Sequence, residues 1–115
     1  GILKVLWELY PNHPLLLETS DKPLQGKKCV KKPLFGREGA NVAIIEANGE
    51  TSLETQGAYG NEKMIYQEFV EFNEHKDECY QAGVFFAYEG CGLGFRKGGL
   101  VLDNYAKFVG HIIKE

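Results

Sequence analysis

Hydrophobic positions at the start of the chain recur at intervals of three and four residues, at Ile2, Leu3, Leu6, Leu9 and Tyr10. That spacing places them on one face of a helix. Pro11 and Pro14 follow at once and prevent a helix from continuing. The pattern therefore predicts a short amphipathic helix over Ile2–Tyr10, whose apolar face needs a partner surface.

Beyond a polar stretch over Thr19–Lys28, which we interpret as a loop, blocks of β-branched and apolar residues alternate with turn signals. These blocks predict strands at Cys29–Phe35, Val42–Glu46, Thr51–Glu54, Met64–Phe72, Cys79–Tyr88 and Cys91–Lys97. Asn48-Gly49 predicts a tight hairpin, because both residues readily adopt positive φ angles. Glu89-Gly90 and Gly98-Gly99 mark further turns, and the charged stretch Asn73–Glu78 separates two blocks. The expected fold class is α+β, with a mainly antiparallel sheet and few helices.

Length and composition bound the organisation of the chain. With 115 residues and 43% hydrophobic content, it is long enough for one domain with one core. No linker, repeat or low-complexity tract divides it, so a single unit is expected. The chain begins directly in the amphipathic segment without a leader, from which we expect a fragment of a longer protein.

Charge and cysteine content exclude several classes of function. The net charge is −3, with basic residues in both halves, so nucleic acid is not an expected partner. The longest apolar runs, such as Leu15–Leu17 and Val84–Ala87, fall far short of the roughly 20 residues of a membrane helix. Three widely spaced cysteines without a Cys-x-x-Cys pair suit a reducing cytoplasm. No His, Cys, Asp or Glu group has ligand spacing, so we expect no metal held by this chain alone.

The segment from Val30 to Val42 carries the strongest chemical signal. Its predicted strand delivers Lys32, and a loop with Gly36 and Gly39 follows before the next strand. Glycines let backbone N–H groups turn toward a bound anion, and a neighbouring lysine neutralises phosphate charge. The segment lacks the Gly-Lys-Ser/Thr ending of a Walker loop and leads into a strand rather than a helix. It permits two interpretations, a phosphate-covering loop and a charged surface hairpin.

Two further segments carry features of a nucleotide site. Lys63–Val70 is an apolar strand running into a polar break, where backbone groups beside apolar side chains suit an adenine; the alternative is an ordinary core strand. Gly90–Lys97 places Arg96 among glycines, where an arginine can pair bidentately with the oxygens of a transferring phosphoryl group. The alternative is a solvated arginine on an edge strand. His13, in the proline-bounded turn after the predicted helix, is interpreted as structural.

Taken in order, these motifs resemble the C-terminal part of the ATP-grasp ligases of the glutathionylspermidine synthetase family, most closely its bacterial acid–amine ligase branch. The resemblance spans nearly the whole chain and rests on Leu6–Pro14, Lys32–Asn41, Ile65–Glu68, Gly94–Arg96 and Asp103-Asn104. It implies part of an ATP-grasp domain and a reaction in which ATP phosphorylates a carboxylate, giving an acyl phosphate that an amine attacks. In that family the acid is the glycine carboxylate of glutathione, and the amine is a polyamine such as spermidine.

The resemblance also assigns roles to residues of this chain. Lys32 would contact the ATP phosphates, and a lid over them would be formed by Glu38, Gly39, Ala40 and Asn41. The adenine edge would be held by Gln67, Glu68, Phe69 and Val70. Gln81 would reach the nucleotide, and Leu100 would line its pocket. Arg96 would be the catalytic arginine, stabilising the transferring phosphate and the tetrahedral intermediate.

Several of the family's functional parts lie upstream of the stretch matched here. These are the magnesium ligands and the residues that bind glutathione and polyamine. Since Mg²⁺ neutralises much of the phosphate charge in phosphoryl transfer, we expect ATP and Mg²⁺ as cofactors of a longer protein and no turnover by this chain alone. We also expect the chain to pack against that upstream part. The competing hypothesis is a non-catalytic, β-rich interaction module derived from such a ligase.

Overall fold

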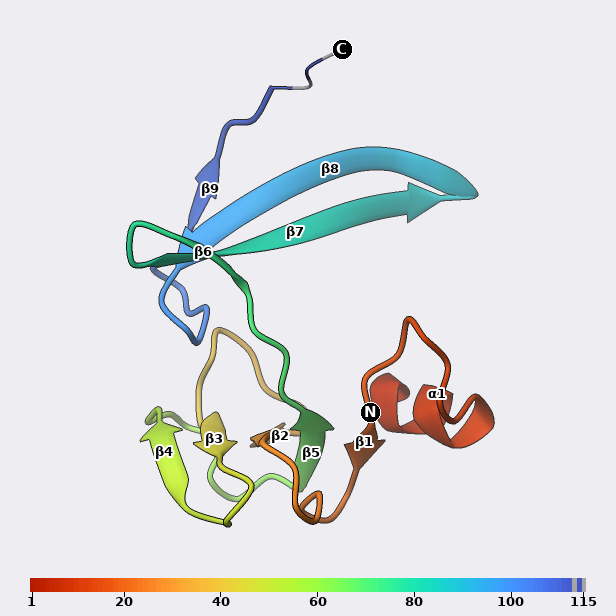
Figure 1. The fold of residues 1–115 in the computed structure, drawn as a ribbon, viewed down its shortest axis with the longest axis vertical. Helices are drawn as coiled ribbons and strands as arrows, with labels where there is room; N and C mark the ends of the chain where they lie inside the picture. The colour runs from red at the N-terminus through yellow and green to blue at the C-terminus, as the bar shows by residue number, and fades with distance from the viewer. Residues whose placement is uncertain (113, 115) are drawn as a thin grey trace. The chain divides into compact units, whose positions relative to one another are not determined.

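The computed structural model describes residues 1–112 and 114, which form one helix and two antiparallel sheets (Figure 1). The expected α+β class is therefore confirmed. The chain divides into two compact units, Gly1–Val70 and Glu71–Glu115, each with its own sheet, rather than the single unit expected. The boundary at residues 69–72 contains no glycine, proline or serine. For this reason it carries none of the composition that marks a linker in sequence.

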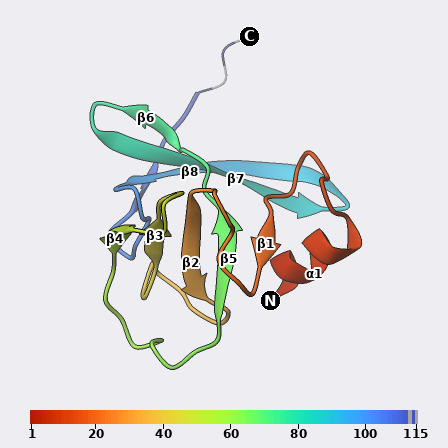
Figure 2. The ribbon, with the colours of Figure 1, turned by 60° about the horizontal axis from the view of Figure 1, so that its bottom comes forward.

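The first unit holds one helix and five strands: α1 (Ile2–Leu9), β1 (Thr19–Ser20), β2 (Cys29–Pro33), β3 (Ala43–Ile45), β4 (Thr51–Glu54) and β5 (Met64–Glu68). The strands lie in the order β1-β5-β2-β3-β4, with α1 beside β1 (Figure 2). All pairings are antiparallel. The last strand along the chain, β5, thus lies between the first two and brings distant segments side by side.

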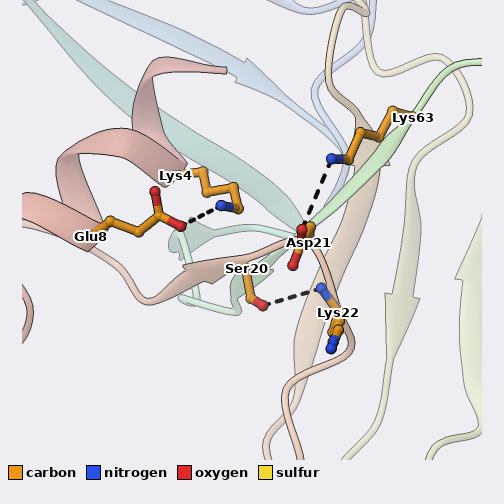
Figure 3. Close-up of polar contacts among 6 residues, drawn as sticks. All are labelled: Lys4, Glu8, Ser20, Asp21, Lys22 and Lys63. Atoms are coloured by element: carbon orange, nitrogen blue, oxygen red, sulfur yellow. Dashed lines mark hydrogen bonds and ion pairs between the residues drawn. The ribbon is translucent and has the colours of Figure 1, made fainter.

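Helix α1 ends one residue before the expected boundary. Tyr10 donates its backbone N–H to the Leu6 carbonyl at 2.9 Å, and the proline at position 11 then prevents a further turn. Lys4 and Glu8 form an ion pair one helical turn apart (Figure 3). No residue of α1 is buried. Its apolar face is therefore largely exposed in this chain.

The polar stretch predicted as a loop at Thr19–Lys28 begins with a short strand, β1. Immediately after that strand, Ser20 Oγ accepts a hydrogen bond from the Lys22 backbone N–H at 3.1 Å (Figure 3). Asp21 pairs with Lys63, which precedes β5, at 3.9 Å. Two residues are too few to show strand periodicity, so the pairing partner in β5 decides this element.

The core of the first unit lies on both faces of its sheet, because successive residues of a strand point to opposite sides. One face buries Ile44, Ile65 and Thr19, at 2%, 4% and 2% exposure. The other buries Cys29 and Ala43, at 1% and 4%. Complete burial of an isoleucine side chain contributes about 1.5–3 kcal/mol. The strands that carry the candidate site are therefore held by packing on both sides.

The second unit contains β6 (Asn73–His75), β7 (Glu78–Ala87), β8 (Glu89–Gly98) and β9 (Lys107–Val109), in that order across the sheet. β7 and β8 form a long hairpin (Figure 1). β6 pairs only with the start of β7, and β9 pairs only with Phe95–Lys97 of β8. The outer half of the hairpin is thus a two-stranded ribbon, where Val84, Phe85, Phe86 and Tyr88 are 63–102% exposed.

Three local expectations are corrected in this unit. The charged stretch Asn73–Glu78 forms β6 and a two-residue turn in which Lys76 and Asp77 have φ angles of 51° and 62°. Such a turn usually uses Asn-Gly, so its sequence signal is absent. The turn expected at Glu89-Gly90 lies instead at Tyr88, with φ 66°, and the dipeptide belongs to β8. The short strand β9 was not expected.

Candidate functional site

Lys32 is the centre of a polar network on one face of the first sheet. Its Nζ donates to Gln67 Oε1 at 2.7 Å, and Gln67 Nε2 lies 3.1 Å from Thr19 Oγ1. Thr19 Oγ1 in turn lies 3.0 Å from the Leu17 carbonyl. Lys32 is directly opposite Ile65, two residues from Gln67, and such diagonal neighbours on one face are within reach of long side chains. Three strands, β1, β5 and β2, therefore build the network.

The ammonium of Lys32 is partly buried, and this burial lowers the pKa of Lys32 below its ordinary value. Other lysines in this unit pair with carboxylates, for example Lys27 with Glu18 at 2.6 Å and Lys28 with Glu46 at 3.1 Å. Within the described residues, Lys32 has no carboxylate within 4.0 Å. A half-buried cation without a counterion attracts an anionic ligand.

The predicted lid, Glu38–Asn41, belongs to the loop that joins β2 and β3. Glu38, Gly39 and Asn41 have φ angles of 58°, 68° and 54°. Their backbone N–H groups donate to no acceptor in the part of the chain that the structure describes, whereas the Ala40 N–H donates to the Arg37 carbonyl at 3.1 Å. Unpaired N–H groups in a turn of this kind are potential donors to an anion.

A second loop, at residues 55–60, holds the lid in place. Thr55 Oγ1 lies 2.6 Å from the Gly39 carbonyl and accepts the Val42 backbone N–H at 2.9 Å. The Tyr59 backbone N–H donates to Asn41 Oδ1 at 2.7 Å. Sequence reasoning did not single out these anchors. No motif marks Thr55 or Tyr59, because their role depends on the two loops meeting in space.

The predicted adenine-binding segment, Gln67–Val70, covers the end of β5 and the residues after it. The backbone N–H of Glu68 donates to the Glu18 carbonyl at 2.8 Å, and that of Phe69 donates to the Lys28 carbonyl at 3.1 Å. These two donors are therefore already used, which differs from the expected strand end with free groups. Val70 is 52% exposed, and its N–H has no partner among the described residues. Within this segment, Val70 offers the available backbone donor.

In the second unit, Arg96 lies on β8, between β7 and β9, so the edge-strand alternative is wrong. Its guanidinium Nη2 donates to Oε1 of the cross-strand neighbour Gln81 at 2.6 Å. Gly83 and Gly94 face each other beside this pair and leave the same face of the sheet without side chains there. No carboxylate of the described chain lies within 4.0 Å of Arg96. Its remaining donors can therefore receive an oxyanion.

The predicted site residues thus fall into two groups, one in each unit. Lys32 and Gln67 are in direct contact in the first unit, where the lid is the loop that follows β2. Gln81 and Arg96 are in direct contact in the second. Leu100 lies after the end of β8 and is 39% exposed.

A shallow hollow of about 220 Å³ is lined by Tyr10, His13, Leu15 and Leu16, and by none of the predicted site residues. His13 Nδ1 accepts the Leu15 backbone N–H at 3.2 Å, which fits the structural interpretation of this histidine. The described residues contain no group of three His, Cys, Asp or Glu side chains placed to hold a metal ion. Nor does that part of the chain contain a helix of the length and apolarity needed to cross a membrane.

Comparison with known proteins identifies relatives among ligases. A protein of Haemophilus influenzae, provisionally named an acid–amine ligase, is 35% identical over 96% of this chain and 31% of its own length. Trypanothione synthetase of Crithidia fasciculata is 36% identical over 71% of this chain and 13% of its own. Bifunctional glutathionylspermidine synthetase/amidase of Escherichia coli is 35% identical over 59% of this chain and 12% of its own length. The chain spans less than a third of the length of each.

Each of these relatives is named as a ligase or a synthetase. The family described as glutathionylspermidine synthase preATP-grasp matches residues 1–114, which is nearly the entire chain. This chain therefore belongs to the glutathionylspermidine synthase preATP-grasp family, a family of ligases.

Proposed function

We propose that this chain is the ATP-binding part of a carbon–nitrogen ligase that joins a carboxylate to an amine through an acyl phosphate. The observation that carries the proposal is Lys32, a partly buried ammonium held by Gln67 at 2.7 Å, with no carboxylate partner among the residues that the structure describes. A lysine in such a setting is suited to phosphate oxygens, because an anion supplies the charge that burial leaves uncompensated.

The lid supports the same assignment. Backbone N–H groups of Glu38, Gly39 and Asn41 lack acceptors among the described residues, and the loop immediately follows the strand of Lys32. Such N–H groups bind phosphate without needing a charged side chain. Thr55 contacts this loop and restricts its motion, so the loop loses less conformational entropy when an anion binds.

Arg96 supports the transfer step. Its contact with Gln81 fixes the guanidinium on the sheet surface and leaves further N–H donors for oxygens. An arginine held in this way stabilises charge on a transferring phosphoryl group without reorganising during the reaction. We assign Arg96 as the catalytic arginine, with Gln81 beside it as a nucleotide contact and Leu100 as an apolar lining residue.

The metal ligands and the substrate-binding residues that the reaction needs are assigned to the rest of a longer protein. We place that protein in the reducing cytoplasm. Mg²⁺ would be held by ligands outside this chain and would supply charge neutralisation for the phosphates of ATP. A glutathione-like carboxylate and a polyamine-like amine are the proposed substrates, by analogy with the names of the relatives. The exposed apolar face of α1 is the proposed surface for packing against the upstream part.

The test is the affinity of the full-length protein for a non-hydrolysable ATP analogue with Mg²⁺, measured by calorimetry. Lys32→Met is expected to weaken binding about 10-fold or more, since a charge-assisted hydrogen bond is worth about 1.5–3 kcal/mol. Lys31→Met is the matched control, because Lys31 precedes Lys32 on the same strand but points to the opposite face. Equal affinities in both variants would refute the assignment of Lys32.

The alternative function, a non-catalytic interaction module, is favoured by one observation. The outer half of the β7–β8 hairpin exposes Val84, Phe85, Phe86 and Tyr88 by 63–102%, and exposed apolar groups of this kind mark interaction surfaces. The two functions differ in their response to nucleotide. An interaction module would show no saturable binding of the ATP analogue in the full-length protein, and no loss on substitution of Lys32.

A further inference from the structure

Thr19 is the most deeply buried polar side chain of the first unit, at 2% exposure, and it contacts Gln67 rather than Lys32 itself. It lies on β1, directly opposite Gln67 on β5, while Lys32 is on β2, the other neighbour of β5. The network therefore runs across three neighbouring strands, β1, β5 and β2, on one face of the sheet. Position in the register places all three side chains on that face.

The polarity of the network follows from the chemistry of its ends. The Thr19 hydroxyl has one hydrogen, which it donates to the Leu17 carbonyl at 3.0 Å. Its oxygen can then only accept, so Gln67 must present its NH₂ group to Thr19. This leaves Gln67 Oε1 facing Lys32, whose ammonium is a donor only. Thr19 and Lys32 thus require the same orientation of the Gln67 amide, and each holds one end of it.

The alternative orientation of the Gln67 amide is excluded by the same reasoning. If the NH₂ group faced Lys32, two donors would oppose each other at 2.7 Å, and the ammonium would lose its acceptor. A buried or half-buried donor without an acceptor destabilises the folded state. The network therefore has one arrangement, in which one N–H of the ammonium is used and the other two remain for a ligand.

We propose that Thr19 is a positioning residue, which acts through the Gln67 amide to hold the Lys32 ammonium in place for the phosphates of a bound nucleotide. The proposal rests on the proposed function, because it needs Lys32 to contact phosphate. The Gln67 side chain then orients the lysine.

The experiment compares Thr19→Val with Thr19→Ser in the full-length protein. Valine keeps the shape and the strand preference of threonine but removes the hydroxyl, whereas serine keeps the hydroxyl. Affinities are measured by calorimetry for inorganic tripolyphosphate, for adenosine, and for the non-hydrolysable ATP analogue, the first and last with Mg²⁺. Tripolyphosphate isolates the part of the ligand that Lys32 contacts, and adenosine isolates the rest.

Thr19→Val is expected to weaken the binding of tripolyphosphate and of the ATP analogue by the same factor, about fivefold. This factor corresponds to about 1 kcal/mol, the contribution of one hydrogen bond. Adenosine affinity is expected to stay unchanged, and Thr19→Ser to restore the affinity for tripolyphosphate. A weaker affinity for adenosine by the same factor would show a general structural role and overturn the inference. So would unchanged tripolyphosphate affinity in the valine variant.

A second readout does not require a nucleotide. NMR titration of ¹³C-labelled lysine side chains, with the Lys32 signal assigned from Lys32→Met, reports the pKa of the ammonium. In Thr19→Val the pKa of Lys32 is expected to fall further, because the Gln67 amide is no longer held at its NH₂ end and its oxygen stabilises the charged ammonium less. In Thr19→Ser it is expected to match the parent protein. An unchanged pKa in the valine variant would overturn the inference.

Gln67→Glu decides the question if the valine variant fails to fold. A carboxylate at this position pairs with Lys32, raises its pKa and competes with phosphate, so tripolyphosphate affinity is expected to fall at least as far as in Lys32→Met. Unchanged affinity in Gln67→Glu would overturn the positioning role. Failure of the proposed function is distinguishable, because Lys32→Met itself would then leave affinity for the ATP analogue unchanged.

Discussion

Replacing Gly57 by alanine tests whether the loop at residues 55–60 holds the lid in place. A Cβ atom at this position would lie 2.5 Å from the Cβ of Ala40 and 2.6 Å from Oδ1 of Asn41. Both distances are below ordinary van der Waals contact. The Asn41 Oδ1 atom also accepts the Tyr59 backbone N–H at 2.7 Å. The added methyl group must therefore displace lid residues and break the hydrogen bond that joins the two loops.

The magnitude follows from these two effects. Forcing an extra carbon into a packed site costs about 1–3 kcal/mol. Loss of the bond between Tyr59 and Asn41 adds about 1 kcal/mol. We therefore expect Gly57→Ala to lower the free energy of unfolding by about 2 kcal/mol or more. For a urea dependence of about 1 kcal/mol per molar, the unfolding midpoint falls by about 2 M.

The assay is urea unfolding followed by the fluorescence of Trp7, the single tryptophan, which lies in the same unit. Hydrogen exchange of the Tyr59 amide reports the local bond. Gly60→Ala is the matched control, because the nearest atom to its added Cβ would be Asn41 Nδ2 at 3.9 Å, an ordinary contact. If Gly57→Ala unfolds at the same urea concentration as Gly60→Ala, the reasoning is refuted.

Three further predictions concern both units. In the full-length protein, Arg96→Ala is expected to lower the kcat of the proposed ligase reaction by about 10²–10³ with little loss of nucleotide affinity, because the role proposed for the guanidinium is to stabilise transition-state charge; an unchanged kcat in steady-state assays would remove that role. A hydrogen bond from Lys97 lowers the pKa of Glu78, so this carboxylate's contribution to stability is present above pH 4.5 and is lost as the pH falls below it through the folded-state pKa. Urea unfolding at pH 7 and pH 3 should show a smaller pH dependence in Glu78→Gln, and an identical dependence would contradict the prediction. Ile44→Ala is expected to lower the free energy of unfolding by about 2–5 kcal/mol, and Phe86→Ser by less than about 1 kcal/mol, because Ile44 is 2% exposed and Phe86 is 75% exposed. Equal losses of stability in thermal unfolding would contradict this view of the core.

The candidate site was partly accessible from the sequence. A lysine before a glycine-containing loop indicated an anion site at Lys32, and an arginine among glycines indicated a second group at Arg96. The partners of these residues were not accessible. Thr19 is 48 positions from Gln67 in the chain, and Thr55 lies 16 positions from Gly39. Their roles arise only when strands and loops that are distant in sequence become neighbours.

Strand assignment shows the same division. Blocks with several β-branched or apolar residues were located from their pattern, which spans enough positions. β4 has the expected bounds, whereas β2 ends at Pro33 rather than Phe35 and β5 at Glu68 rather than Phe72. β1, β6 and β9 have two or three residues each, which is too few for a pattern. These strands form because a longer neighbour supplies hydrogen-bonding partners along its edge.

The amino-acid sequence by itself determined the α+β class, the helix ended by Pro11, the hairpin at Asn48-Gly49 and the family to which the chain belongs. These depend on local conformational preference and on motifs that are contiguous in the chain. Tertiary structure alone decided the division into two units, the strand order that places β5 between β1 and β2, and the network that holds Lys32. Each depends on which distant segments pair, and pairing is selected by the burial of both sheet faces together rather than by any single segment.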